Sequence, residues 1–228
     1  MVGAGAGSLS GRVVGVDEGR VANVAAALLV GGTSSRMGED KSHLLLAGTP
    51  AAVRIGGLLG SLFDDVMLVG GDPPAAARGR RIADGPGPVC ALRGLVSALD
   101  AAAAARVLVV ATDLPLLSAD LLLALVAWPE ADTVAPRTER GWQPLCAIYR
   151  RETVLPVARR RLAAGELALR GVLGAVDTRE FGPEELARVD PDGSALFNVN
   201  TPQELVRIRA LLGEAPAEED RARPERPG

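Results

Sequence analysis

The chain has 228 residues, of which 48% are hydrophobic and only 3% aromatic, and its formal net charge is −3. This length suffices for one substantial domain whose core needs no disulfide or metal. Because acidic and basic residues are interspersed, the charge pattern argues against a nucleic-acid partner. Cys90 and Cys146 lack the spacing of a zinc site or a disulfide framework, and the most apolar stretch is interrupted by Asp113 and Asp120. We therefore expect a cytoplasmic protein without a signal peptide or a membrane span.

The two ends of the chain differ in composition from its middle. Residues 1–20 are rich in glycine and show no hydrophobic period, and the stretch from Glu214 is rich in Pro, Ala and charged residues. Such compositions cannot bury enough apolar surface to fold. We expect a disordered extension over 1–20, one domain over 21–213 and a disordered tail over 214–228.

Short apolar runs alternate with longer Ala- and Leu-rich stretches between these ends, a pattern typical of parallel strands joined by crossover helices. The predicted strands are 24–30, 65–69 and 106–110, with weaker ones at 133–135, 145–149 and 197–199. The predicted helices are 50–62, 92–105, 118–127 and 201–212. The resulting fold class is α/β, with a mostly parallel open sheet and helices on both faces.

Two of these helices carry recognisable start signals. Ser118 is a suitable N-cap for the helix over 118–127. Thr201 as N-cap, Pro202 at the first helical position and Glu204 at the third form a capping box, so the helix over 201–212 is the best-defined local element.

The first strand runs into a glycine-rich turn that ends in two cations, Arg36 and Lys41. Glycines let backbone N–H groups approach an anion, small hydroxyls add donors, and fixed cations neutralise phosphate charge. The spacing excludes a P-loop, because two acidic residues separate Gly38 from Lys41, and a dinucleotide fingerprint, because Gly31 and Gly32 are adjacent. The turn could therefore be a phosphate-binding turn of another kind. The simpler interpretation is that it binds nothing, as many glycine-rich turns do.

Two further groups of residues accompany predicted strands, whose carboxyl ends are where open parallel sheets bind their ligands, and Asp84 is an additional candidate. Asp113 follows the strand over 106–110 and offers the lone hard oxygen that suits Mg²⁺, although taken alone it could equally form a turn with Pro115. Asp84 precedes a Gly-Pro turn, and Asn198 and Asn200 alternate so that both amides could face one ligand.

The order of these motifs resembles that of the sugar-nucleotide-type nucleotidyltransferases and, within them, the molybdenum cofactor guanylyltransferases. The resemblance covers about residues 22–212 and rests on the turn over 31–41, on Asp113-Leu114-Pro115 and on the segment over 197–205. It implies a nucleotide-diphospho-sugar transferase-like, Rossmann-like fold. The chain departs from the family in Val30, where alanine is usual, and in a stretch over 87–99 that is about two residues longer. We expect Val30 to be tolerated while narrowing the pocket for the base.

The resemblance also implies an activity: transfer of GMP from GTP to the terminal phosphate of the molybdopterin cofactor, giving a guanine dinucleotide and pyrophosphate with Mg²⁺ as cofactor. It places Arg36, Lys41 and Asp113 in catalysis, with Asp113 as metal ligand. The nucleotide-binding residues that it implies are Leu29, Val30, Gly31, Gly32, Thr33, Ser34, Lys41, Asp84 and Asp113. The acceptor-binding residues are Gln143, Asn198 and Asn200.

Two alternatives stay open from the sequence. A cytidylyltransferase acting on the same cofactor shares these motifs, and a non-catalytic nucleotide or pterin carrier could use the same fold. Maturation proteins of molybdoenzymes are further expected partners, and the expected state is a monomer or a weak homo-oligomer.

Overall fold

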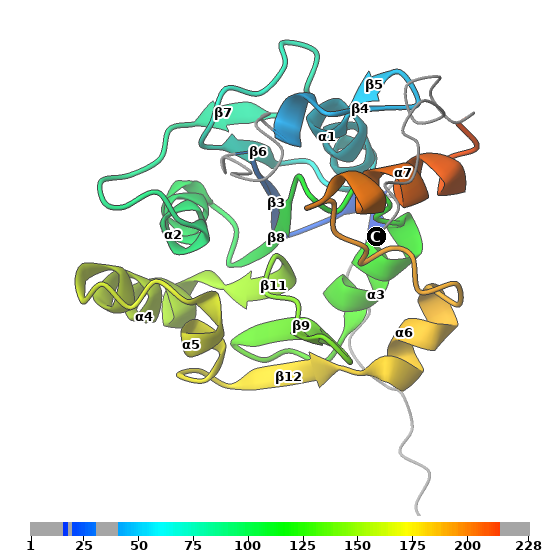
Figure 1. Cartoon of the computed structure of the whole chain (residues 1–228). Coiled ribbons are helices and arrows are strands. Elements are labelled where there is room, and N and C mark those ends of the chain that lie inside the picture. Colours follow the sequence, from blue (N-terminus) through cyan, green and yellow to red (C-terminus); the bar gives the residue numbers. More distant parts are fainter. Residues whose placement is uncertain (1–15, 18–19, 31–40, 215–228) are drawn as a thin grey trace, which may run out of the picture.

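The computed structural model describes residues 16–17, 20–30 and 41–214, and a single large sheet runs through the middle of this part (Figure 1). Its strands are β3 (Val24–Leu29), β6 (Val66–Val69), β7 (Arg80–Ile82), β8 (Arg106–Ala111), β9 (Thr133–Thr138), β10 (Gly141–Trp142), β11 (Cys146–Arg150) and β12 (Thr178–Phe181). They lie in the order β10-β9-β11-β8-β3-β6-β7, and β12 pairs with β9.

The sheet is mostly parallel, as predicted. Strand β3 pairs in parallel with β6 and β8, β6 pairs in parallel with β7, and β12 pairs in parallel with β9. Strand β11 is antiparallel to both β8 and β9, so it is a reversed strand between two strands of like direction. The short strand β10 pairs antiparallel with β9.

Helices cover both faces of the sheet, which also confirms the predicted fold class. They are α1 (Ala51–Leu62), α2 (Ala91–Ala101), α3 (Ala119–Ala127), α4 (Arg151–Ala163), α5 (Leu169–Leu173), α6 (Pro183–Val189) and α7 (Pro202–Leu211). Alternate side chains of β3 enter different cores: Ala26 and Leu28 pack with α1 and α3, whereas Ala27 and Leu29 pack with α2 and α4. Figure 1 shows α2, α4 and α5 together on one side of the sheet and α1, α3 and α6 on the other.

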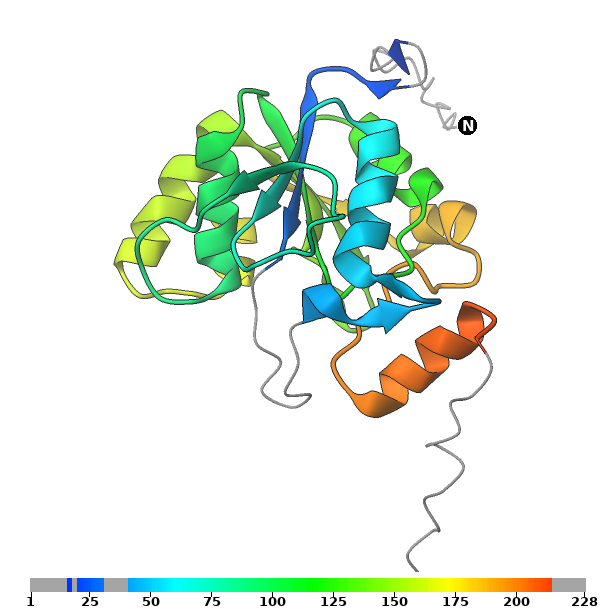
Figure 2. The same cartoon turned by 90° about the horizontal axis from the view of Figure 1, so that it is seen from above.

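A third, smaller core fixes the C-terminal helix. Lys41–His43 form one turn of 3₁₀ helix, η1, followed by a hairpin of β4 (Leu45–Leu46) and β5 (Thr49–Pro50). Leu46 from the hairpin packs with Val199 and with Ile208 of α7. Figure 2 shows α7 lying beside this hairpin. This packing holds the segment before α7 against the hairpin.

Most of the predicted elements are confirmed, and the capped helix starts are confirmed in detail. Leu121 N–H donates to Ser118 Oγ at 3.2 Å, and Glu204 N–H donates to Thr201 Oγ1 at the same distance. The prediction of a strand over 197–199 was wrong. Val199 N–H donates to the Asp113 carbonyl at 2.9 Å, but this single bond is not continued into a ladder.

The N-terminal stretch differs in part from the expected disorder over 1–20. Residues Val16–Asp17 (β1) pair antiparallel with Arg20–Val21 (β2), and Arg20 donates to Asp64 at 2.9 Å and to the Gly60 carbonyl at 2.8 Å. These contacts tie the start of the described chain to the end of α1. The remaining residues of 1–20 and those from 215 onward lie outside the described part.

No helix within the described ranges combines the length and apolar character needed to cross a bilayer.

The two thiols should differ sharply in reactivity. Cys146 is 0% exposed within β11, and burial raises the pKa of its thiol to about 12, whereas Cys90 is partly exposed at the start of α2. Because the thiolate is the reactive form, a thiol reagent should modify one cysteine in the native protein and the second only in denaturant. In a Cys90→Ser variant the native protein should not react, and equal labelling of both native thiols would contradict the prediction.

Candidate functional site

The carboxyl ends of β3 and β8 lie side by side in the centre of the sheet. The chain leaves β3 for β6 and β7 and then returns to β8 on the other side of β3, so the boundary between β3 and β8 is the topological switch point. Leu29 pairs with Ala111, and Thr112 N–H donates to the Leu29 carbonyl at 3.3 Å. Open α/β sheets bind ligands in the crevice outside such a point.

Three predicted site residues meet at this edge of the sheet: Lys41, Asp113 and Asn200. Lys41 Nζ lies 3.6 Å from Asp113 Oδ2 and donates a short hydrogen bond to Asn200 Oδ1. Lys41 and Asp113 are 15% and 20% exposed, so both charges are largely removed from solvent. Lys41 is also the only lysine of the chain. This edge of the sheet therefore holds a largely buried cation beside a largely buried carboxylate.

The backbone around Asn200 is fixed by the start of α7. Glu204 Oε2 accepts hydrogen bonds from the N–H groups of Asn200 at 2.8 Å and Thr201 at 3.0 Å. Val199 is buried in the small core and bonded to the Asp113 carbonyl. The capping box that starts α7 thus also holds Asn200 against Lys41.

Asp113 has a raised pKa, chiefly because burial disfavours its charged form. The nearby Lys41 lowers the pKa and so opposes this effect, while Glu204 raises it further. Lys41 therefore does not fully offset the cost of burying the Asp113 charge, and an additional cation would reduce this cost.

Asp113 could hold a divalent cation only if waters and a bound substrate supplied the remaining ligands. Among the described residues, no three His, Cys, Asp or Glu side chains are grouped to form a metal cage. Mg²⁺, however, is usually held by one or two carboxylates together with waters and substrate phosphates. Asp113 matches that mode of binding.

Asp84 lies at the same edge of the sheet but has a different partner. It follows β7, and its Oδ2 pairs with Arg93 Nη2 of α2 at 2.7 Å. A Cβ on Gly70 would lie 2.6 Å from Asp84 Oδ2, so this position, with φ +71°, has room only for glycine. Gly94 packs α2 closely onto β3, since a Cβ there would lie 3.2 Å from Leu29 Cδ1.

At the end of β3, two backbone groups that could bind a ligand already take part in hydrogen bonds with neighbouring segments. The Leu29 carbonyl accepts from Thr112, and Val30 N–H donates to the Val69 carbonyl at 2.9 Å. The Val30 side chain is 1% exposed and packs in the core on the α1 and α3 side. The core therefore encloses its methyl groups, and the expectation that they narrow a pocket for the base stays a prediction. Predicted residues Gly31, Gly32, Thr33, Ser34 and Arg36 lie outside the described part of the chain.

The predicted acceptor residues are not all brought together. Gln143 Nε2 donates to Thr138 Oγ1 at 3.3 Å, and Gln143 N–H donates to the Pro136 carbonyl at 2.9 Å, so Gln143 is tied to β9. Asn198 is partly exposed and precedes the buried Val199. Only Asn200 of this group contacts Lys41.

The sequence analysis missed three residues that hold the site in place. Arg93 and Ser97 of α2 bind the segment after β7, and the Tyr149 hydroxyl donates to the Pro144 carbonyl at 2.6 Å beside Gln143. Arg93 and Ser97 are four residues apart and so lie on one face of the predicted helix over 92–105. This spacing was the signal that could have pointed to them.

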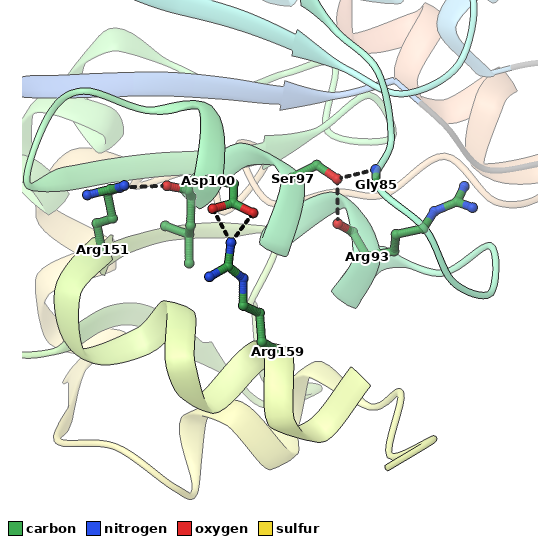
Figure 3. Close-up of polar contacts among 7 residues, drawn as sticks. Gly85, Arg93, Ser97, Asp100, Arg151 and Arg159 are labelled. Atoms are coloured by element: carbon green, nitrogen blue, oxygen red, sulfur yellow. Dashed lines mark hydrogen bonds and ion pairs between the residues drawn. The ribbon is translucent and has the colours of Figure 1, made fainter. Parts of the chain in front are cut away.

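A cavity of about 730 Å³ lies beside Asp84 and not at the Lys41–Asp113 pair. It is bounded by residues 82–83 and 85–88, by α2 and by α4. Asp100 of α2 and Arg159 of α4, joined by a short ion pair, line it (Figure 3).

The sheet order and the switch point, with Lys41 and Asp113 paired beside it, fit a nucleotidyltransferase-type α/β fold. Comparison of the fold agrees. Molybdopterin-guanine dinucleotide biosynthesis protein A from Archaeoglobus fulgidus superimposes with a TM-score of 0.71 at 22% identity, covering 83% of this chain and 98% of that one. 2-C-methyl-D-erythritol 4-phosphate cytidylyltransferase from Thermus thermophilus gives 0.63 at 16% identity, with the same coverage.

Sequence comparison narrows the class. Residues 26–179 match the MobA-like NTP transferase domain. A probable molybdenum cofactor guanylyltransferase of Chloroflexus aggregans is 35% identical over 195 residues, which are 82% of this chain and 93% of that protein. The molybdenum cofactor guanylyltransferase of Desulfosudis oleivorans is 28% identical over 193 residues, 81% of this chain and 94% of that protein. The chain belongs to the MobA-like NTP transferase family and, within it, to the molybdenum cofactor guanylyltransferases.

Replacing Asp113 by Asn should stabilise the folded protein at neutral pH. The raised pKa of Asp113 means that the folded state binds a proton more readily than the unfolded state, whose carboxyl titrates near 3.8. The ionised carboxylate therefore lowers the free energy of unfolding at pH 7, and this penalty fades as the pH falls through the raised pKa. Urea unfolding at pH 7 should show a higher free energy for Asp113→Asn, with the difference shrinking in acid.

The matched control is Asp120→Asn, which changes an exposed carboxylate in the first turn of α3. It should give no gain at pH 7. An Asp113→Asn variant that is no more stable than the wild type at pH 7 would show that the Lys41 pair outweighs burial.

Proposed function

We propose that this enzyme transfers GMP from GTP to the terminal phosphate of the molybdopterin cofactor. An oxygen of that phosphate would bond to the α-phosphorus of GTP. The bond from this phosphorus to the bridging oxygen would break, and pyrophosphate would leave. The observation that carries the proposal is the Lys41, Asp113 and Asn200 cluster at the switch point, in a chain related to proteins named guanylyltransferases.

The acceptor supplies its own nucleophile, so the protein contributes positioning and charge. Lys41 would bind phosphate oxygens of the nucleotide, and Asn200 would hold the ammonium in place through its carbonyl oxygen. Arg36 would hold the pyrophosphate together with Lys41, and Leu29, Val30 and Gly31 would offer backbone groups to the base.

Asp113 is the residue that would hold Mg²⁺. When bound, this ion neutralises phosphate charge and orients the phosphate groups. The raised pKa of Asp113 supports the role, because a carboxylate short of positive charge gains most from a cation. Asp84 would contact the nucleoside, while Asn198, Asn200 and Gln143 would border the acceptor.

The cytoplasm is the compartment that we propose, and both cysteines are free thiols. Maturation proteins as partners and the monomeric or weakly oligomeric state stay predictions.

A pyrophosphate-release assay with the molybdopterin cofactor and Mg²⁺ tests the proposal directly. GTP, CTP, ATP and UTP are supplied in turn, and GTP should dominate. Dominant CTP turnover would instead indicate a cytidylyltransferase. Nucleotide binding without turnover of any of the four would indicate a carrier.

Asp113→Asn is the informative variant for this assay. It should lose about 100-fold or more in turnover while GTP still binds measurably, since removal of one charge-stabilising group costs roughly this much. Near-normal turnover would remove Asp113 from the metal-binding role. Asp120→Asn should retain wild-type turnover.

Lys41 offers a separate test, because it and the N-terminal amine are the chain's only amines of this type. If Lys41 binds phosphate, GTP with Mg²⁺ should slow its modification by an amine-reactive reagent severalfold. Mass spectrometry of the two labelled positions gives both rates, and the N-terminal amine is the internal control. Equal rates at Lys41 with and without nucleotide would contradict phosphate binding there.

A further inference from the structure

The turn that carries Asp113 is held only weakly by its own hydrogen bonds. Leu114 N–H donates to the Ala111 carbonyl and Leu117 N–H donates to the Leu114 carbonyl, both at 3.4 Å, which is longer than the roughly 2.7–3.2 Å typical of such bonds. Pro115 contributes no N–H group to the turn. Contacts with other segments must therefore set the position of Asp113.

Two carbonyl groups of this turn accept hydrogen bonds from distant parts of the chain. Val199 N–H, in the segment before α7, donates to the Asp113 carbonyl at 2.9 Å. Arg54 Nε, on α1, donates to the Pro115 carbonyl at 3.2 Å. The turn is thus held from two sides, and each bond fixes a direction, which apolar packing alone does not do.

Helix α1 also contacts the segment that carries Lys41. The N–H of Ala51, the first residue of α1, donates to the Leu44 carbonyl at 2.9 Å, one residue after η1. Figure 2 shows α1 starting directly at the hairpin of β4 and β5. Lys41 and Asp113 therefore share α1 as a support, and Arg54 is the side chain that joins this helix to the Asp113 turn.

The surroundings of Arg54 separate its hydrogen bond from the packing of α1. Arg54 is exposed, whereas its neighbours Ala52 and Ile55 are buried in the core that also contains Leu114. Replacement of Arg54 should therefore leave this core intact. Its effect on Asp113 can be measured in a folded protein.

We infer that Arg54 is a positioning residue that holds Asp113 beside Lys41 through the Pro115 carbonyl. The inference rests on the proposed function, in which Asp113 holds Mg²⁺ and Lys41 binds phosphate. A guanidinium donates its hydrogen bonds in a fixed plane, so it can orient a carbonyl only two residues from Asp113. A displacement of about 1 Å in a group that positions substrate can cost roughly 100-fold in rate.

Labelling of Lys41 by an amine-reactive reagent, with neither nucleotide nor Mg²⁺ present, tests the geometry alone. The Lys41 side chain is 15% exposed, and Asp113 and Asn200 lie against it. In Arg54→Met the Asp113 turn loses one of its two distant bonds, so the labelling rate at Lys41 should rise severalfold. The N-terminal amine is the internal control and should keep its rate.

Pyrophosphate release over a range of Mg²⁺ and GTP concentrations tests the consequence for the reaction. Arg54→Met should lower kcat about tenfold, as expected when a hydrogen bond to a charged group is lost. The Mg²⁺ concentration that gives half the maximal rate should rise, while the KM for GTP changes little. Arg54→Lys, which can still donate to the carbonyl, should recover part of both losses.

The matched control is Arg20→Met, which acts on the other end of the same helix. Arg20 donates to the Gly60 carbonyl at 2.8 Å and pairs with Asp64 at 2.9 Å. This variant should keep the wild-type labelling of Lys41, kcat and Mg²⁺ dependence. Thermal unfolding checks that each variant is folded. Arg54→Gln, with a shorter side chain, provides a second variant with the same expected changes should Arg54→Met fail to fold.

Several results would overturn the inference. These are wild-type labelling of Lys41 in Arg54→Met, a loss of kcat without a change in Mg²⁺ dependence, or equal changes in Arg54→Met and Arg20→Met, which would indicate a general loosening of α1. Failure of the proposed function looks different, because the wild type itself would then release no pyrophosphate. The labelling of Lys41 would in that case still decide whether Arg54 places Asp113.

Discussion

The candidate site depends on the parallel pairing of β3 with β8. All six residues of β3 are buried, and its run of alanines lets helices on both faces approach the sheet closely. The register sets Leu29 against Ala111, so the segments that leave the two strands start from the same point. Lys41 and Asp113, although far apart in the sequence, meet there because this ladder fixes where each segment begins.

Burial of the Asp113 carboxylate lowers the stability of the folded protein at neutral pH. Burial raises the pKa of Asp113 even with Lys41 nearby, so the pair does not fully offset the cost of removing the carboxylate from water. Perturbed groups of this kind concentrate at functional sites, where a ligand supplies the missing partner. The capping box of α7 provides the rigidity, since Glu204 holds the backbone of Asn200 while Asn200 binds Lys41.

The elements that depend on local sequence patterns were predicted correctly. Continuous apolar runs identified β3, β6 and β8, and the Thr201 box identified α7. Helix α4 was missed because Pro156 and several arginines obscure its period, although its buried face packs on the sheet. The reversed direction of β11 and the pairing of Asp84 with Arg93 are decided by tertiary packing. Neither hydrophobic period nor spacing encodes such contacts.

The two aspartates at this edge of the sheet have environments suited to different partners. Asp84 makes a 2.7 Å ion pair with an arginine, so its charge is locally matched and its remaining oxygen suits a neutral donor. Asp113 faces its lysine at 3.6 Å and has a pKa raised by burial, so it favours an additional positive charge. In the nucleotide complex that we propose, the nucleoside would supply the neutral donors and Mg²⁺ would supply the charge. The difference between the two ion pairs supports the proposed arrangement, in which the nucleoside would lie toward α2 and the phosphates toward Lys41.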